Sequence, residues 1–501
     1  MTRRFILSPL TILGMVLFLA AGELVSGTSL PFVAIMAVAM LAIGATYNML
    51  GGLGTFGGVL FAIFALNTLV VSQFAKVFML EAADLTLRSP VLTIAVYAVY
   101  FLSLMVGVFL FGRARLQLPR PLEPTTALHS GVIYTVSLVI GLSATMYMTN
   151  LALMHPETAG SAEHGIARAF ALLLPLSLVI AVDARLRKTG GAHCFGWAAF
   201  WPAFAIEFLG FMAASRTGFL MPPFLVLITC YFRGFRFRSR HYIAGGAIVA
   251  LLFLVVSPWF LWSRSFRNQT SLWRQIAVMS RLAAAAPAYW PEVKGSVQES
   301  MTRAAAKGGE YFRKTGTVTL DRFVLIPDDD AVISACSHWH WGLATVRIDA
   351  ENSIPHFILP NKPDRDGSWY RASIGGLQSS YQPSGFVTTS IIADAWGGFG
   401  WAGVIVVPLL LVPWFFVEYN SMFDMSQPWG TVALVVTALK VAVGSVATLL
   451  LGMMLSMPIY ILLISWFTGW LTRYVPFVGD SLHRKGVPLF QRQGIRSTAG
   501  D

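Results

Sequence analysis

Arg216 is the residue of this sequence whose type and position best suit the binding of an anionic ligand. It lies in the segment Ser-Arg-Thr-Gly at 215–218, and an apolar stretch begins directly after it. A guanidinium beside the free backbone N–H groups of a helix N-terminus is a natural receptor for a phosphate-like anion. The alternative is a purely topological arginine. We expect Arg216 to bind an anion at a membrane surface, with Arg264 and Arg267 converging on the same anion.

Two residues are the leading candidates for a general base. His356 lies in the proline-rich segment 354–363, and a neutral imidazole accepts a proton near neutral pH without further tuning. Asp394 lies in Ala-Asp-Ala-Trp-Gly-Gly-Phe-Gly at 393–400, where the glycines allow a bend. A structural role for both is the alternative. Further candidates for the base are His338, His340 and Glu351.

Two more cations are candidates for binding an anionic ligand. Lys362 is held between Pro360 and Pro363, which stiffen the chain and fix the position of its charge. Arg322 lies in a short apolar segment at 317–326, which three aspartates follow in a predicted acidic turn. We expect both cations to contact the ligand.

A metal site is the other chemistry to weigh. Cys336, His338 and His340 alternate, so they would share one face of an extended chain. Their spacing matches no usual structural zinc pattern, and no second ligand pair completes it. We therefore expect no metal and no other cofactor, and we expect the tryptophans at 339 and 341 to pack the segment.

The elements that carry these residues are predicted to be membrane spans. Apolar residues make up 56% of the 501 positions, charged residues only 12%, and the mean hydropathy is +0.65. Apolar runs long enough to cross a hydrocarbon core recur from end to end. The sequence thus predicts an all-α polytopic membrane protein of about twelve helices, at roughly 7–25, 30–50, 56–75, 91–112, 128–149, 166–182, 195–213, 218–232, 242–262, 387–417, 431–450 and 452–472.

The distribution of charge predicts the topology. With both termini in the cytoplasm, the clustered Lys and Arg at 113–120, 183–188, 233–240 and 473–496 all fall inside. The net charge of +12 is therefore a topological signal, and we expect no binding of nucleic acid. The expected location is the bacterial inner membrane.

This topology divides the chain into four predicted parts. They are an N-terminal membrane bundle of about nine helices at 1–262, a large, partly helical periplasmic loop at 263–386, about three further membrane helices at 387–472, and a basic cytoplasmic tail at 473–501. Residues 271–290 read as an amphipathic helix lying on the bilayer. A loop of this length within a membrane protein is typical of a substrate site or a lid.

Three motifs resemble the O-antigen and exopolysaccharide repeat-unit polymerases (Wzy type) of the O-antigen polymerase and ligase superfamily. They are the turn at 215–218, the segment Ile-Pro-His-Phe-Ile-Leu-Pro-Asn-Lys-Pro at 354–363, and the segment at 390–403. Their order, and the position of the large loop between late helices, also match. The sequence departs from the family's pattern at His356, where Arg is frequent, at Asn361, where Asp is frequent, and at Asp394, where Glu is common.

The resemblance implies a metal-independent glycosyltransferase at the periplasmic face. Its donor would be a glycan on undecaprenyl pyrophosphate, and Arg216 and its neighbours would neutralise the leaving pyrophosphate. A base would take the proton from the acceptor sugar hydroxyl. The implied partners are the lipid-linked glycan, the lipid bilayer, a chain-length regulator and a flippase.

Two other functions are open at the level of sequence. A ligase of the same superfamily would share the donor chemistry and transfer the glycan to another acceptor. A flippase-type polysaccharide or lipid transporter would also contain cations, but these should line the bundle instead of clustering outside it.

Overall fold

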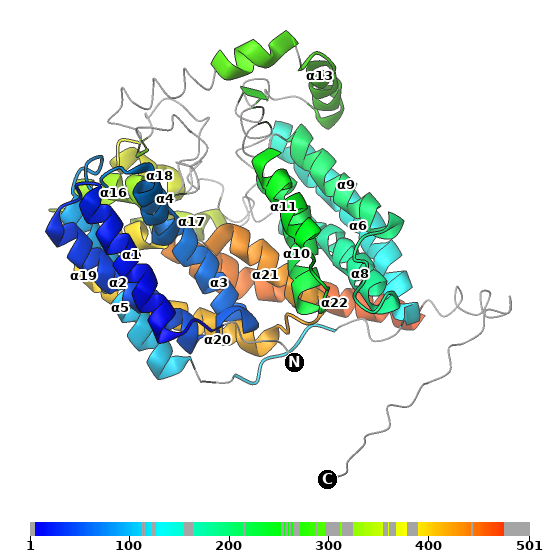
Figure 1. Ribbon diagram of the computed structural model, residues 1–501. Helices are drawn as coiled ribbons and strands as arrows, with labels where there is room; N and C mark the ends of the chain where they lie inside the picture. The colour runs from blue at the N-terminus through cyan, green and yellow to red at the C-terminus, as the bar shows by residue number, and fades with distance from the viewer. Residues whose placement is uncertain are drawn as a thin grey trace.

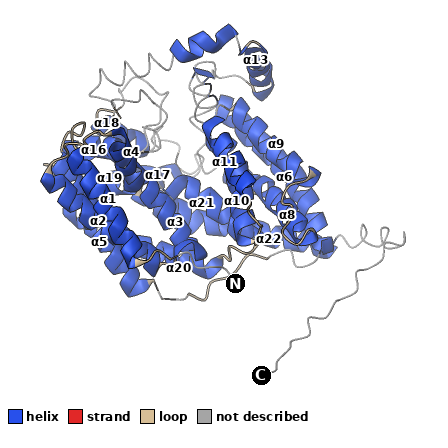
Figure 2. Ribbon diagram, in the orientation of Figure 1, coloured by secondary structure: helices blue, strands red, loops and turns tan. Residues whose placement is uncertain are grey.

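The computed structural model describes most of the chain. The described residues are 6–112, 114, 116–122, 127–154, 164–213, 216–251, 255, 259, 262–263, 271–286, 288–295, 311–312, 324–353, 359, 367–377, 389–441 and 444–474. Within them, every regular element is a helix (Figure 2). The predicted all-helical fold class is confirmed for this part of the chain.

The first half of the chain forms two helical layers. The first layer contains α1 (Pro9–Val25), α2 (Leu30–Met49), the short 3-10 helix η1 (Gly52–Gly54), α3 (Phe56–Ala65), the π-helix η2 (Leu66–Val70), α4 (Val71–Met79) and α5 (Pro90–Phe111). The second layer contains α6 (Ala127–Met154), α7 (Gly165–Ala171), α8 (Leu173–Lys188), α9 (Trp197–Met212), α10 (Arg216–Phe232) and α11 (Ser239–Leu251).

The second half adds the loop helices and the last apolar helices. The loop helices are α13 (Leu272–Ala284), α16 (Ile326–Ala335), α17 (Ala344–Ser353) and α18 (Gly367–Ile374). The last helices are α19 (Ile391–Val406), the π-helix η6 (Val407–Leu411), α20 (Val412–Met422), α21 (Pro428–Val441), the π-helix η7 (Thr448–Ser456) and α22 (Met457–Tyr474).

Seven helical stretches among the described residues are long and apolar enough to cross a membrane, and four shorter apolar helices accompany them. The seven are Leu30–Gly54, Phe56–Met79, Pro90–Phe111, Gly131–Met154, Gly165–Lys188, Ile391–Met422 and Thr448–Trp470. The shorter four are Pro9–Val25, Trp197–Met212, Gly218–Phe232 and Pro428–Ala438. This composition is that of a membrane protein.

Packing joins the two layers through α21. Helix α19 packs against α5, and α2 packs between α1 and α5, whereas α8 contacts α6, α9 and α10 (Figure 1). Helix α21 contacts α3 on one side and α8 and α10 on the other. Edge-to-face rings contribute where α3 meets its neighbours, because Phe61 contacts both Phe101 and Phe416.

Helices α16, α17 and α18 pack at one end of this bundle, which we call the loop face. Helix α16 contacts α5 and α19, and α17 contacts α19 and η7. The helix bounds follow local sequence signals, since Ser8 caps α1 ahead of Pro9 and Ser390 caps α19. The end at which α1 begins and α2 ends is the opposite face, where Asn48 binds the backbone of Leu7.

Two expectations about local structure were wrong. The predicted acidic turn at 328–330 is the first part of α16, because Pro327 and the aspartates favour a helix N-terminus. The predicted eleventh span does not continue to 450, since α21 ends at Val441 and a non-helical turn at 444–445 precedes η7, where the Ser445 hydroxyl accepts the N–H of Thr448. Helix α10 begins at Arg216, and its apolar part, Gly218–Phe232, agrees with the expected span at 218–232.

The predicted amphipathic helix exists as α13, and its buried face is occupied by protein. Leu272 and Met279 pack against Leu209 and Met212 of α9 and Leu153 of α6. Figure 1 shows α13 near the ends of α6 and α9, and α13 contacts both helices. The exposed face of α13 includes Trp273, which is 70% exposed.

Candidate functional site

The loop face contains a buried polar cluster, which we call the loop-face cluster. It is built from α16, α17, α18, the N-terminal ends of α5 and α19, and the turn before η7. Its main side chains are Asp329, Asp330, Asp349, Arg371 and Asp394.

A buried ion pair forms its centre. Nη1 of Arg371 lies 3.3 Å from Oδ1 of Asp394, and the two side chains are 4% and 1% exposed. Arg371 also donates through Nε to the hydroxyl of Thr389 at 3.0 Å. The other oxygen of Asp394 accepts the backbone N–H of Val446 at 2.8 Å. Both carboxylate oxygens are therefore occupied, and the pair joins α18, α19 and the turn before η7.

Asp329 connects α16 to α5 and to the cap of α19. It accepts the backbone N–H of Ser390 at 2.7 Å and the Tyr97 hydroxyl at 2.5 Å, and the Ser390 hydroxyl donates to it as well. Burial raises the pKa of Asp329 to about 6, although these hydrogen bonds oppose the rise. The residue is thus poised to change its protonation near neutral pH.

Asp330 holds the start of α5. Its carboxylate accepts the backbone N–H groups of Arg88 at 2.5 Å and Ser89 at 3.0 Å, together with the hydroxyl of Thr93 at 2.7 Å. A carboxylate at this position compensates both the unpaired N–H groups and the positive end of the helix dipole. The Arg88 side chain adds a second contact by donating to the carbonyl of Gly375, directly after α18, at 3.1 Å.

Asp349 of α17 connects α17 and α18 to the turn between α21 and η7. It accepts the backbone N–H of Gly367, at the start of α18, at 2.8 Å. It also accepts the hydroxyl of Ser445 at 3.0 Å. Since Ser445 and Val446 are adjacent, Asp349 and Asp394 hold the same turn from two directions.

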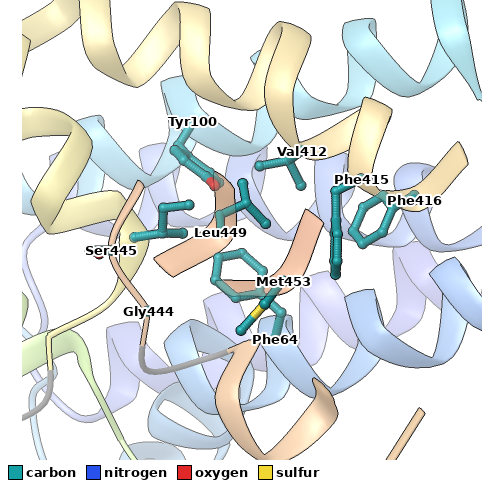
Figure 3. A pocket seen from close by; sticks show the side chains of 10 residues that line it. Phe64, Tyr100, Val412, Phe415, Phe416, Gly444, Ser445, Leu449 and Met453 are labelled. Atoms are coloured by element: carbon teal, nitrogen blue, oxygen red, sulfur yellow. The ribbon is translucent and has the colours of Figure 1, made fainter. Parts of the chain in front are cut away.

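A small cavity of about 20 Å³ lies beside this turn (Figure 3). Gly444 and Ser445 are part of its lining, together with Phe64, Tyr100, Ile391, Val412, Phe415, Phe416, Leu449 and Met453. The volume is enough for one water molecule. The Tyr100 hydroxyl is buried and has no hydrogen-bond partner among the described residues, so it is the polar group that a bound water would meet.

The segment that follows α16 packs closely against glycines of α19. The N–H groups of Trp341 and Gly342 donate to the carbonyls of Gly397 and Gly398, both at 2.9 Å. A Cβ on Gly397 would lie 2.0 Å from the Trp341 ring. Gly400 has φ +58° inside α19, so the bend predicted from these glycines is confirmed.

The metal-site geometry considered from sequence does not form. Cys336 ends α16 and is fully buried, whereas His338 and His340 are exposed. The three side chains therefore do not share one face. Among the described residues there is no group of three or more His, Cys, Asp and Glu side chains that could hold a metal ion.

The structure places two of the predicted site residues. Asp394 is in the loop-face cluster, and Arg216 is the first residue of α10, with its side chain outside the described part. The other predicted site residues also lie outside the described part of the chain, and they are Arg264, Arg267, Arg322, His356 and Lys362. Of the alternative bases, Glu351 pairs with Arg347 at 2.6 Å.

Sequence reasoning did not identify Arg371, Asp329 or Lys76 as important. Lys76 is 1% exposed, lies 3.1 Å from Glu81, donates to the carbonyl of Tyr311 and lies 4.3 Å from the Tyr311 ring. A lysine inside an apolar helix was the available signal, because it must find a partner when buried. Arg371 carries no comparable signal, since it lies in a short polar helix.

The described part of the chain is thus that of a helical membrane protein in which buried charged side chains attach α16, α17 and α18 to the bundle. Comparison with protein-family models, with curated proteins and with solved structures gives no match.

Proposed function

We propose that this protein is an integral membrane glycosyltransferase that polymerises undecaprenyl-pyrophosphate-linked oligosaccharide repeat units into a surface polysaccharide at the periplasmic face. The observation that carries the proposal is the fixed attachment of the loop helices to the bundle through Arg371–Asp394 and Asp329–Ser390. A reaction on a lipid-borne glycan needs a site on the loop that is held at a constant height above the membrane. The three motifs that resemble repeat-unit polymerases support the same reading.

The proposal places the loop face in the periplasm and the opposite face in the cytoplasm, with about twelve spans in all. Basic residues support this orientation. Arg185, Arg187 and Lys188 lie in the last turn of α8, and Arg233 and Arg236 follow α10, all at the opposite face. Cytoplasmic connections are enriched in such residues.

In the proposed reaction, Arg216 binds the pyrophosphate of the donor beside the first backbone N–H groups of α10. The acceptor hydroxyl gives its proton to a base as it attacks the anomeric carbon, and undecaprenyl pyrophosphate leaves. One oxygen of Asp394 is in the ion pair with Arg371 and the other accepts the N–H of Val446, so we assign Asp394 a positioning role. His356 is then the leading candidate for the base, with Lys362 beside it in sequence.

Lipid-linked glycans from a strain that lacks the protein test the proposal. A polymerase predicts accumulation of single lipid-linked repeat units, and wild-type protein should restore long chains. Arg216→Lys keeps the charge but loses the bidentate geometry, so it should restore the chains poorly at equal expression. Accumulation of long lipid-linked chains would instead indicate a ligase or an exporter.

A further inference from the structure

Two cysteines lie at the opposite face, away from the loop-face cluster, where Cys194 packs against the core cluster that contains Cys230. Cys194 lies in the turn between α8 and α9, and Cys230 lies near the end of α10. The turn lies against the chain that follows α10, because the N–H of Arg236 donates to the carbonyl of Gly191 at 3.3 Å. A Cβ on Gly191 would lie 3.0 Å from the carbonyl oxygen of Gly234, so the two backbones are close.

An ion pair fixes the same corner. Asp183, near the end of α8, binds Arg233 at 2.8 Å and Arg187 at 2.8 Å. The Arg233 side chain is only 14% exposed, so this contact is largely shielded from solvent. The ends of α8 and α10 are therefore held together without any covalent bond between the cysteines.

The two thiols differ in accessibility. Cys194 is half-buried and Cys230 is buried. The hydrogen bond from the Cys230 thiol lowers the pKa of Cys194 below its ordinary value, although burial opposes this effect. An accessible sulfur that favours the thiolate, next to a buried second thiol, is the arrangement of a reactive cysteine with a resolving partner.

We propose that Cys194 and Cys230 form a reversible dithiol site that reacts with small-molecule disulfides. The Cys194 thiolate attacks one sulfur of the disulfide and releases the other half as a thiol, which leaves a mixed disulfide on Cys194. Cys230 then loses its proton and attacks the Cys194 sulfur, which releases the second small thiol. The two protein thiols are oxidised to one disulfide, and the small disulfide is reduced to two thiols.

This site goes beyond the proposed glycosyl transfer and does not depend on it. With the orientation proposed above, the pair lies in the reducing compartment, where a protein disulfide is transient. The bond would connect the α8–α9 turn to α10, the helix that begins at Arg216. The redox state of the opposite face would thus constrain the helix that carries the proposed anion-binding arginine.

Counting thiols in the purified full-length protein tests the proposal. The reduced protein has three cysteines, and after treatment with oxidised glutathione and unfolding we expect one maleimide-reactive thiol, that of Cys336. Peptide mapping should find Cys194 linked to Cys230, which requires no variant. Cys336→Ser is the matched control, and it should lose both of its thiols under the same treatment.

Two further variants separate the steps. Cys230→Ser should stop at the mixed disulfide and carry one glutathione on Cys194, whereas Cys194→Ser should keep both of its thiols. Wild-type protein that retains three thiols would overturn the proposal. So would a glutathione adduct on the wild type without an internal bridge, or equal loss of the Cys230 thiol in Cys194→Ser.

Discussion

The charges of Arg371 and Asp394 are almost completely shielded from water, so each depends on the other. Removing one partner of a buried pair costs about 3–5 kcal/mol, because the remaining charge stays buried. We expect Asp394→Asn and Arg371→Met each to lower the stability of the purified protein by that order. Replacing both together with apolar residues should cost much less. Thermal unfolding of the two single variants and the double variant measures the coupling, and additive losses would show that the pair contributes nothing.

Asp329 predicts a dependence of stability on pH with a definite sign. Its pKa in the folded protein is raised from 3.8 to about 6 by burial, so the folded state binds the proton more tightly than the unfolded chain. The stabilisation from this residue is complete below the unfolded value and is lost as pH rises through about 6. The protection factors of the α16 amides, which remove the intrinsic pH dependence of hydrogen exchange, should therefore be higher at pH 5 than at pH 7. Asp329→Asn should remove this difference, and a slope of the opposite sign in the wild type would contradict the assignment.

At the scale of elements, the contact between the segment after α16 and the glycines of α19 gives a testable prediction. Gly397→Ala places a Cβ against the Trp341 ring, and overpacking of this kind costs about 1–3 kcal/mol. Gly245→Ala in α11 is the matched control, since a Cβ there meets nothing within 4 Å. Limited proteolysis between α16 and α17 should be faster in Gly397→Ala and unchanged in Gly245→Ala. Equal rates in both variants would mean that the packing of Trp341 on Gly397 does not hold this segment in place.

The helices of the bundle could be predicted from sequence, and the loop-face cluster could not. Apolar runs and Pro or Ser at their starts locate elements such as α5, because these signals are local. The partners of Asp329 and Asp330 lie on α5 and α19, at large sequence separation, and no local pattern encodes such contacts. The turn at 444–445 could not be predicted either. The apolar run around it indicates a continuous helix, and Ser445 is the residue that interrupts this run.

At the scale of the whole molecule, the orientation in the membrane is the remaining prediction. The native cysteines are poor reporters of it, because Cys336 is fully buried and would not react on either side. Ser337 and Ala192 are both exposed, on the loop face and the opposite face respectively. Each can carry a single cysteine in a variant whose three native cysteines are replaced by serine.

Labelling of these two variants with a membrane-impermeant maleimide decides the orientation. If the positive-inside bias is read correctly, Ser337→Cys reacts in intact spheroplasts and Ala192→Cys reacts only after permeabilisation. Both sites are exposed in the folded protein, so a difference between them reports the side of the membrane and not burial. The reverse pattern would place the loop-face cluster in the cytoplasm. A glycosyl transfer that uses a periplasmic lipid-linked donor would then be impossible for this protein.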